Sequence, residues 1–309
     1  MKCMNFGVRQ LAVPLDIKDK YLKWLFVLPA LILLTVFAII PYLWTFGMSF
    51  YDYSVSVFGR TPDFIGLQNY EILMTHPDIW LRFQNTAKFS VTAVTIEFLF
   101  GLMLAMLLFE HFRGRRLILT LCVLPMMIAP EITAMVFKMV MFRPDIGFVN
   151  YLMKLLGIPY EGYGRDAFFS VVSVDVWTWT PFIMLMIIGG LSSVPKSVLE
   201  SSDVDGAGWW SRFRYVIFPY ARPFMLLAVI FRLADSFRTW EVIREFLEVP
   251  PPVGPDPLGI DMLPSYLYAL AFRAFKSSEM MATAIIMVVM SLVLVYTYLR
   301  YLKRIEKHE

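Results

Sequence analysis

The sequence predicts an all-α, polytopic membrane protein with six transmembrane helices, and three observations support this fold class. Hydrophobic residues make up 58% of the chain and charged residues only 17%, too little charge to cover the surface of a soluble globule. The apolar residues are gathered in long runs, each close to the ~20 residues that a helix needs to cross a bilayer. Lysine and arginine concentrate in alternate connections between these runs, as expected for a multi-pass protein.

Six apolar runs mark the expected spans. In lipid the backbone must satisfy its own hydrogen bonds, so runs of this length form helices. The predicted spans are 24–46, 86–109, 117–141, 167–191, 223–243 and 280–301. Residues 1–23 then form an N-terminal tail, residues 24–309 form the transmembrane domain, and residues 192–222 form a long loop on the same side as the tail.

The distribution of basic residues predicts the orientation. Sixteen Lys and Arg residues lie in the tail, in the connections 110–116 and 191–222, and from Arg300 onward. The intervening segments together carry eight. Since cytoplasmic segments carry the excess of positive charge, we expect both termini and the 192–222 loop to be cytoplasmic.

The 192–222 loop predicts a short helix, a glycine turn and a second helix. Pro195 favours a helix start, and Gly206 can adopt the left-handed conformation that ends a helix. Aromatic residues follow Gly206 at helical spacing, and we expect Pro219 and Pro223 to close this second helix before the fifth span. The residues alone fit a helix lying on the membrane surface as well as a helix that binds a partner.

The same loop resembles the EAA loop of permease subunits of ATP-binding-cassette importers. That pattern is Glu-Ala-Ala, three residues, Gly and, after a longer spacer, Ile-x-Leu-Pro. Serine replaces both alanines here, and the Asp-Gly-Ala around the glycine matches the form found in carbohydrate permeases. The residues that carry the match are Glu200, Ser201, Asp205, Gly206, Ala207 and Pro219.

Further segments resemble carbohydrate permeases of the maltose type, in particular the family of its F subunit. Phe-Val-Leu-Pro at 26–29, Gly-Leu-Gln-Asn-Tyr at 66–70 and Trp-Thr-Trp-Thr-Pro-Phe at 177–182 are similar to that family. The resemblance implies a type I importer permease fold in the cell (inner) membrane of a bacterium or archaeon, and import of a sugar or related polyol. The chain departs from the family at 247–255, where a proline-rich segment replaces a Thr-x-Gly-Gly-Pro-like stretch.

The resemblance also implies partners. They are two ATPase (nucleotide-binding) subunits, a second permease subunit and an extracytoplasmic solute-binding protein. Glu200 and the turn at Gly206 would fix the helix that docks on an ATPase subunit. This chain would bind no cofactor and would not be an enzyme, with ATP and Mg²⁺ held by partner subunits. It lacks a Gly-x-x-x-x-Gly-Lys-Ser/Thr phosphate loop, and its basic residues form no stripe suited to nucleic acid.

Two polar faces are predicted within the membrane. The fifth span carries, at spacing i, i+3, i+4 and i+7, Arg232, Asp235, Ser236 and Thr239. The fourth repeats this spacing with Asp175, Thr178, Trp179 and Phe182. Carboxylates and hydroxyls can hydrogen-bond a sugar while aromatic rings cover its apolar faces, and the resemblance places these eight positions at the substrate site. The alternative is that Arg232 and Asp235 form a structural ion pair and the rings only pack.

Other functions fit these features less well. Glu131 and Lys138 share a face of the third span and could form an ion relay, although a structural role is favoured. An ion-coupled secondary transporter using Glu131, Asp175 or Asp235 would show inverted repeats, which are not evident. A membrane-embedded enzyme would need a catalytic constellation at one membrane face, and the sequence offers none.

Overall fold

The computed structural model describes residues 19–305 except 55–60, 110–111, 163 and 248–257. The chain divides into two compact units, Met1–Gly47 and Met48–Glu309. Most of the predicted tail and most of the proline-rich segment therefore lie outside the described residues.

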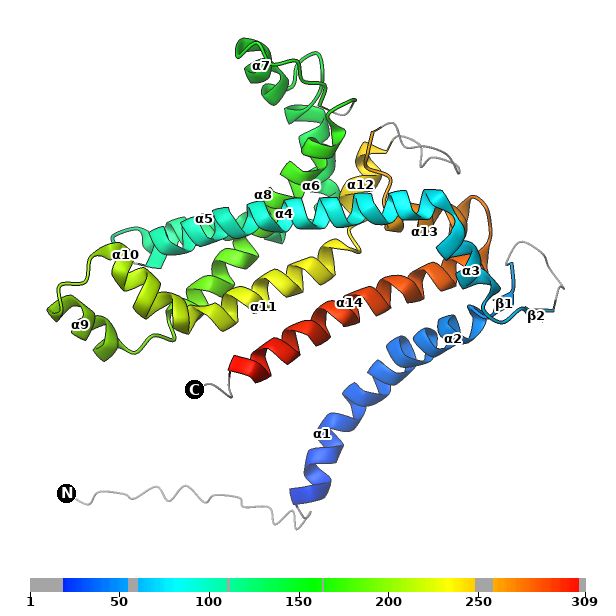
Figure 1. Ribbon diagram of the computed structural model, residues 1–309, viewed down its shortest axis with the longest axis horizontal. Helices are drawn as coiled ribbons and strands as arrows, with labels where there is room; N and C mark the ends of the chain where they lie inside the picture. The colour runs from blue at the N-terminus through cyan, green and yellow to red at the C-terminus, as the bar shows by residue number, and fades with distance from the viewer. Residues whose placement is uncertain (1–18, 55–60, 110–111, 163, 248–257, 306–309) are drawn as a thin grey trace, which may run out of the picture. The chain divides into compact units, whose positions relative to one another are not determined.

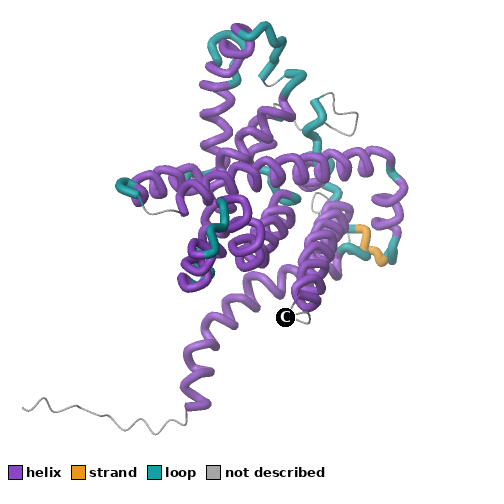
Figure 2. The backbone as a smooth tube through the Cα atoms, turned by 60° about the vertical axis from the view of Figure 1, so that its left-hand side comes forward, coloured by secondary structure: helices purple, strands orange, loops and turns teal. Residues whose placement is uncertain are grey.

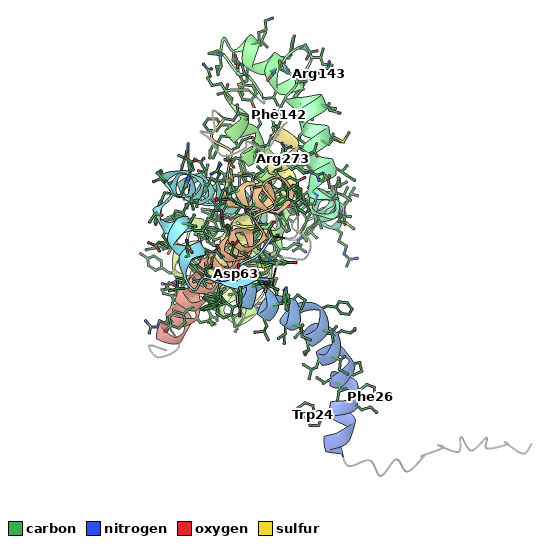
Figure 3. The ribbon with its side chains drawn as sticks, turned by 90° about the vertical axis from the view of Figure 1, so that its right-hand side faces the viewer. Trp24, Phe26, Asp63, Phe142, Arg143 and Arg273 are labelled. Atoms are coloured by element: carbon green, nitrogen blue, oxygen red, sulfur yellow. The ribbon has the colours of Figure 1, made fainter. Side chains whose placement is uncertain are left out.

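The first unit is one helical rod. It consists of α1 (Asp19–Leu34), a π-helical stretch η1 (Thr35–Ile39) and α2 (Ile40–Met48). The rod is apolar on every side, and Figure 3 shows Trp24 and Phe26, 56% and 76% exposed, projecting from it. The wider π turn ends just before Pro41, which lets the helix pass the proline ring without a break. An apolar helix without a polar face is suited to lipid or to another subunit, in agreement with the predicted first span.

The second unit is a helical bundle with a short two-stranded sheet (Figure 1). In the sheet, Tyr51 of β1 (Tyr51–Asp52) lies opposite Phe64 of β2 (Asp63–Phe64). The helices are α3 (Gln68–Thr75), α4 (Pro77–Phe109), α5 (Arg115–Met127), α6 (Pro130–Val136), η2 (Phe137–Met141), α7 (Phe148–Leu155), α8 (Ala167–Leu191), α9 (Lys196–Val204), α10 (Trp209–Arg212), η3 (Phe213–Ile217), α11 (Phe218–Ser236), α12 (Glu241–Phe246), α13 (Leu263–Phe272) and α14 (Ser277–Ile305).

The centre of the bundle is α8. It packs along α4 and α11, and α11 in turn packs along α14, as the views in Figures 1 and 2 agree. Its bounds are those of the predicted fourth span, and more than half of its most apolar stretch is buried. One core cluster is built around Val171 and Phe246, and another around Ile187 and Met225. Helices that are apolar on several faces and mutually buried are what a membrane-spanning core requires.

The third predicted span is wrong as a single straight helix. α5 and the α6–η2 helix are each apolar but meet at an angle of 94°. Ala129 precedes Pro130 and has extended backbone angles (φ −58°, ψ 130°), because the proline ring disfavours the helical conformation of the residue before it. Among the described residues, five helices are long and apolar enough to cross a membrane, or six if this bent pair counts as one span.

The fifth predicted span is shifted toward the N-terminus. One continuous apolar helix runs from Trp209 to Ser236, so neither Pro219 nor Pro223 ends a separate helix as predicted. The reason is η3, in which the Phe218 amide donates to the Phe213 carbonyl and opens the turn before Pro219. The helix ends at Ser236, and the residues up to Ile243 belong in part to the separate α12.

The connections lie at two ends of the second unit. In Figure 1, α9 and α10 lie at one end of the bundle, and α3 and the sheet lie at the other. The predicted loop at 192–222 and the segment before the second span are therefore on opposite ends, as a spanning bundle requires.

Candidate functional site

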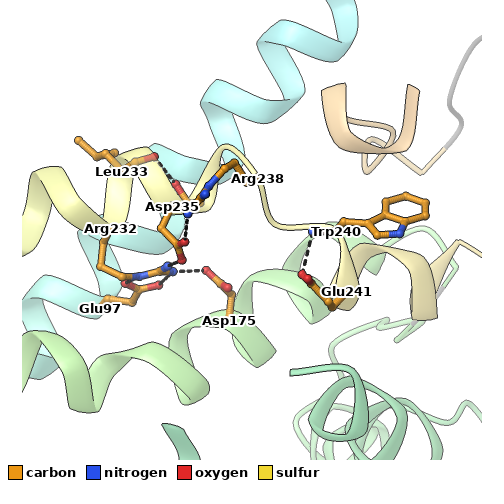
Figure 4. A network of polar contacts seen from close by, with 9 residues as sticks. Glu97, Asp175, Arg232, Leu233, Asp235, Arg238, Trp240 and Glu241 are labelled. Carbon is orange, nitrogen blue, oxygen red and sulfur yellow. Dashed lines mark hydrogen bonds and ion pairs between the residues drawn. The ribbon is translucent and has the colours of Figure 1, made fainter. Parts of the chain in front are cut away.

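An arginine with three carboxylate partners lies in the middle of the bundle (Figure 4). Each side-chain nitrogen of Arg232, on α11, donates a hydrogen bond. Nε and Nη2 donate to the two oxygens of Glu97 on α4, Nη1 donates to Asp235 and Nη2 also donates to Asp175 on α8, all at 2.8 Å. The side chains of Arg232, Glu97 and Asp175 are fully buried. This network, the Arg232 cluster, thus joins three helices through one guanidinium.

The cluster confirms one prediction and exceeds it. Arg232 and Asp235 do pair one turn apart, as the sequence indicated. The guanidinium also lies 4.6 Å from the centre of the Trp179 ring, a cation–π contact. Burial of a charge is unfavourable unless it is paired and hydrogen-bonded. The bidentate Glu97 contact supplies the strongest such pairing.

A cavity of about 340 Å³ lies beside the cluster. This volume falls within the range of roughly 300–1,000 Å³ typical of small-molecule sites. Its lining is Pro130, Asp175, Trp179, Asp235, Arg238, Thr239, Glu241 and Val242. Four of the eight predicted substrate residues are therefore among the cavity walls, which combine an aromatic ring, a hydroxyl and several charges.

The other four predicted residues lie elsewhere. Thr178 and Ser236 are buried, and their hydroxyls donate to backbone carbonyls of their own helices, at 2.8 and 2.9 Å. Phe182 packs against Phe231 with ring centres 5.1 Å apart. Arg232 stands behind the cavity wall in its cluster. These placements leave Asp175, Trp179, Asp235 and Thr239 as the predicted residues in the cavity lining, and among them Asp175 is fully buried in the wall.

The helical face predicted for the fifth span is wrong at its last member. Thr239 was placed one turn beyond Asp235 on the same helix, but α11 ends at Ser236 and Thr239 lies in the turn that follows. This turn redirects the chain into α12. Thr239 and Glu241 reach the cavity because of that turn and not by helical periodicity.

The predicted coupling segment has a defined geometry at one end of the bundle. α9 carries the exposed Glu200 and Ser201 and has Asp205 as its C-cap. Gly206 then takes φ +67°, and a Cβ built there would meet no atom within 4 Å. The constraint at Gly206 is therefore backbone conformation and not space, since side-chain-bearing residues are strained at positive φ.

An ion pair holds the two arms of this turn together. Asp203 of α9 accepts a hydrogen bond from Nη1 of Arg212 in α10 at 2.7 Å. Ala207, the third residue of the Asp-Gly-Ala sequence, donates its amide to the Ser202 carbonyl at 3.0 Å. Pro219, in contrast, lies inside the long helix that begins at α10. The predicted helix–glycine turn–helix is confirmed, and its second helix continues into the membrane-spanning α11.

Glu131 and Lys138 each have a partner on α12. Glu131 forms an ion pair with Arg244, and Lys138 Nζ donates to the Glu245 carbonyl at 2.7 Å. Both contacts tie the bent α6–η2 helix to α12, which is the structural role favoured from the sequence.

Comparison with known proteins decides the family. Residues 97–307 match the family described as the binding-protein-dependent transport system inner membrane component. The chain belongs to this family. It is accordingly a permease subunit of a binding-protein-dependent importer and a multi-pass protein of the inner membrane, which favours the importer over the ion-coupled transporter.

Relatives cover most of the permease. It is 31% identical over 232 residues to the trehalose/maltose transport system permease protein MalF of Thermococcus litoralis, covering 74% of this chain and 78% of the relative. It is 30% identical over 226 residues to the sn-glycerol-3-phosphate transport system permease protein UgpA of Pectobacterium atrosepticum, covering 71% and 74%.

A solved structure shows the same fold. A chain of a bacterial alginate ABC transporter, in complex with an alginate pentasaccharide-bound periplasmic protein, aligns with a TM-score of 0.77. The identity is 22%, with 94% of the permease and 96% of that chain covered.

Sequence reasoning missed three charged residues of the site. Glu97 is the bidentate partner of Arg232, and Arg238 and Glu241 line the cavity. Glu97 carried a usable signal, because an ionisable residue inside an apolar span requires a partner. Nothing in the sequence assigned Arg238 and Glu241 to the site, because their positions depend on where α11 ends, at Ser236.

Proposed function

We propose that this permease carries a sugar or related polyol through the membrane by way of the cavity beside the Arg232 cluster. The observation that carries the proposal is the lining of this cavity, where the Trp179 ring, the Thr239 hydroxyl and carboxylates converge between apolar helices. An aromatic ring covers the apolar face of a sugar, and carboxylates accept hydrogen bonds from its hydroxyls. The names of the relatives, which include trehalose/maltose and sn-glycerol-3-phosphate permeases, support a polyhydroxylated substrate.

The proposed partners follow from the family. The chain would assemble with a second permease subunit and two ATPase subunits, and would receive its solute from an extracytoplasmic binding protein. ATP and Mg²⁺ would be bound by the ATPase subunits, and this chain would be non-catalytic. The alginate ABC transporter with the same fold, which was solved in complex with a periplasmic protein, supports delivery of the solute by a binding protein.

We place the coupling function on α9, the Gly206 turn and α10. Glu200, Ser201 and the Asp205–Ala207 turn lie outside the core of the bundle and are largely exposed, so a partner can reach them. α10 continues without interruption into α11, which carries Arg232. A displacement of α10 by an ATPase subunit would therefore reach the cavity through one rigid helix, as a two-state mechanism of alternating access requires.

The orientation proposed from the sequence fits this arrangement. Both termini and the α9–α10 end would be cytoplasmic, because the tail, the connections 110–116 and 191–222 and the segment from Arg300 onward carry sixteen Lys and Arg residues, against eight in the intervening segments. The end that carries α3 and the sheet would then face the extracytoplasmic binding protein.

The test uses the purified importer in proteoliposomes with its binding protein, measuring sugar uptake and ATP hydrolysis together. We expect uptake to require ATP in the absence of any ion gradient. Gly206→Ala should lower the sugar imported per ATP hydrolysed by about tenfold, since backbone strain at positive φ amounts to about 1–3 kcal/mol.

Gly208→Ala is the matched control. Gly208 lies in the same turn with an ordinary φ of −61° and open space around its Cβ position. The control should retain coupled uptake. Normal coupling in Gly206→Ala, or uptake driven by an ion gradient without ATP, would contradict the proposal.

A further inference from the structure

The two arginines beside the cavity are already engaged by carboxylates. Each nitrogen of Arg232 donates to Glu97, Asp175 or Asp235. Arg238 donates from Nη2 to Asp235 Oδ1 at 2.9 Å. A phosphate or carboxylate on a solute would have to displace a carboxylate to bind Arg232, although a guanidinium is the side chain best suited to bind either anion. Of the two arginines, Arg238 is 66% exposed and pairs through one nitrogen, so it is the one that an anion in the cavity can reach directly.

The cavity and its wall carry more negative than positive charge. Asp175, Asp235 and Glu241 line the cavity, with Arg238 as the one cationic residue of the lining. The cluster behind the wall adds Glu97 and Arg232. Four carboxyl groups face two guanidinium groups, and the carboxyl groups still outnumber the guanidinium groups by three to two when the fully buried Asp175 is left out. Charges between apolar helices are screened less than at a surface, so this excess repels an anion more strongly there.

One carboxylate oxygen in the wall also lacks a hydrogen-bond donor. Asp175 Oδ2 accepts from Arg232, but Oδ1 is buried and has no partner in the part of the chain that the structure describes. In Figure 4, Asp175 lies between Arg232 and Glu241, and both Asp175 and Glu241 belong to the cavity lining. A buried acceptor without a donor is unfavourable by itself and gains from any ligand that supplies a hydroxyl hydrogen.

We infer that the cavity selects a neutral, polyhydroxylated solute and rejects phosphorylated and uronic-acid sugars. Asp175 is the principal specificity residue, because its Oδ1 accepts a hydrogen bond from a solute hydroxyl. Glu241, which also belongs to the cavity lining, contributes repulsion of anions. This inference rests on the proposed function of the cavity and narrows the substrate class of that site.

The test measures binding of labelled sugars to the purified permease complex in nanodiscs by equilibrium dialysis, without the binding protein, whose own specificity would otherwise dominate. A neutral panel holds trehalose, maltose and glycerol. An anionic panel of similar size holds maltobionate, a digalacturonate and sn-glycerol 3-phosphate. We expect at least one neutral solute to bind about 10- to 100-fold more tightly than any anionic one, the range expected for one hydrogen bond to a charged group plus repulsion.

Two variants separate the contributions. Asp175→Asn should weaken binding of the neutral solute by about tenfold and reduce the discrimination against anionic solutes. Glu241→Gln should raise the ratio of anionic to neutral binding by about threefold to tenfold, because it removes a negative charge from the cavity lining. Glu241 lies outside the Arg232 cluster, so this second variant still reports if Asp175→Asn does not fold. Asp145→Asn, the same chemical change at an exposed turn, is the control and should alter neither panel.

The outcomes are distinct. Tighter binding of an anionic solute than of every neutral one, or unchanged discrimination in both cavity variants, overturns the inference and leaves the transport function standing. Binding of no member of either panel overturns the proposed function of the cavity and the inference with it.

Discussion

Two buried arginines in the second unit show how differently the same residue can be used. Arg82 on α4 donates from Nε to Asp261 Oδ2 at 2.7 Å, and its Nη2 forms an ion pair with the same oxygen at 2.7 Å. Its guanidinium lies 4.7 Å from the centre of the Tyr266 ring. Arg232 has the same kinds of contact, carboxylates and an aromatic ring, but it serves three carboxylates. Both side chains are at most a few per cent exposed.

The two arrangements differ in the kind of hydrogen-bonding atom that is left without a partner. Around Arg82 a donor is left, since Nη1 has no hydrogen-bond partner among the described residues. Around Arg232 an acceptor is left, Asp175 Oδ1, and it belongs to a residue that lines a cavity. A one-to-one pair between neighbouring elements holds a fold together. A cluster with surplus carboxylate at a cavity is in addition able to bind a solute.

The largest effect should come from Arg232→Met. The variant would leave Glu97 and Asp175 buried without their cation, and breaking a buried pair in this way destabilises by about 3–5 kcal/mol. Arg82→Met should be milder, because Asp261 keeps the Ser265 hydroxyl as a donor. Unfolding of the purified complexes by SDS titration in mixed micelles would give both values. A larger loss in Arg82→Met would show that the three-carboxylate cluster is not the main polar anchor of the bundle.

Neutralising the carboxylates should reverse that order. Asp261→Asn leaves Arg82 with no ionised partner in its pair, and we expect a loss near the same ~3 kcal/mol in the same unfolding assay. Glu97→Gln leaves Arg232 with two carboxylates and relieves part of the charge surplus, so its loss should stay below about 1.5 kcal/mol. Equal losses would show that Arg232 depends on Glu97 as much as Arg82 depends on Asp261.

The arrangement of the helices was predictable where apolar content decides it. α8 has the bounds predicted at 167–191, because an unbroken apolar run flanked by polar residues has one favourable placement in lipid. The effect of proline was not predictable in the same way. Pro130 breaks the third span, whereas Pro41 and Pro219 are each preceded by a π turn and the helix continues. The local sequence does not specify which response the surrounding packing will favour.

About half of the site could be predicted from the sequence, for a related reason. Helical spacing correctly brought Arg232 and Asp235 together within one helix, as periodicity can. Glu97 joins them from α4, and that contact depends on how α4 and α11 pack. Thr239 and Glu241 depend on where α11 ends. Contacts within a helix can be derived from spacing, whereas contacts between helices need the packing.

The aromatic rings beside the two arginines allow a further test, with smaller expected effects on stability. Trp179→Leu and Tyr266→Leu each remove a ring beside an arginine, and loss of a desolvated cation–π contact should lower stability by about 1–2 kcal/mol in both. Only Trp179 lines the cavity. Sugar binding by equilibrium dialysis should therefore weaken at least about tenfold in Trp179→Leu and stay near the parent value in Tyr266→Leu. Equal weakening in both variants would place the binding defect in the fold and not in the cavity.

The smallest effect on stability should come from Arg238→Ala. Arg238 pairs with Asp235 but its side chain is 66% exposed, and exposed ion pairs contribute about 0–1 kcal/mol. Arg143→Ala removes a comparable exposed ion pair, the one with Asp145. Neither residue belongs to the cavity lining, so this variant serves as the control. The two variants should lose the same small amount of stability in the unfolding assay.

Arg238→Ala and Arg143→Ala should differ in selectivity, because loss of Arg238 removes the cation of the cavity lining and makes the site more negative. Weaker binding of anionic sugars in Arg238→Ala, with none in Arg143→Ala, would separate the charge of the cavity from the stability of the bundle. Tighter binding of anionic sugars by Arg238→Ala would mean that the positive charge of Arg238 does not attract anions into the cavity.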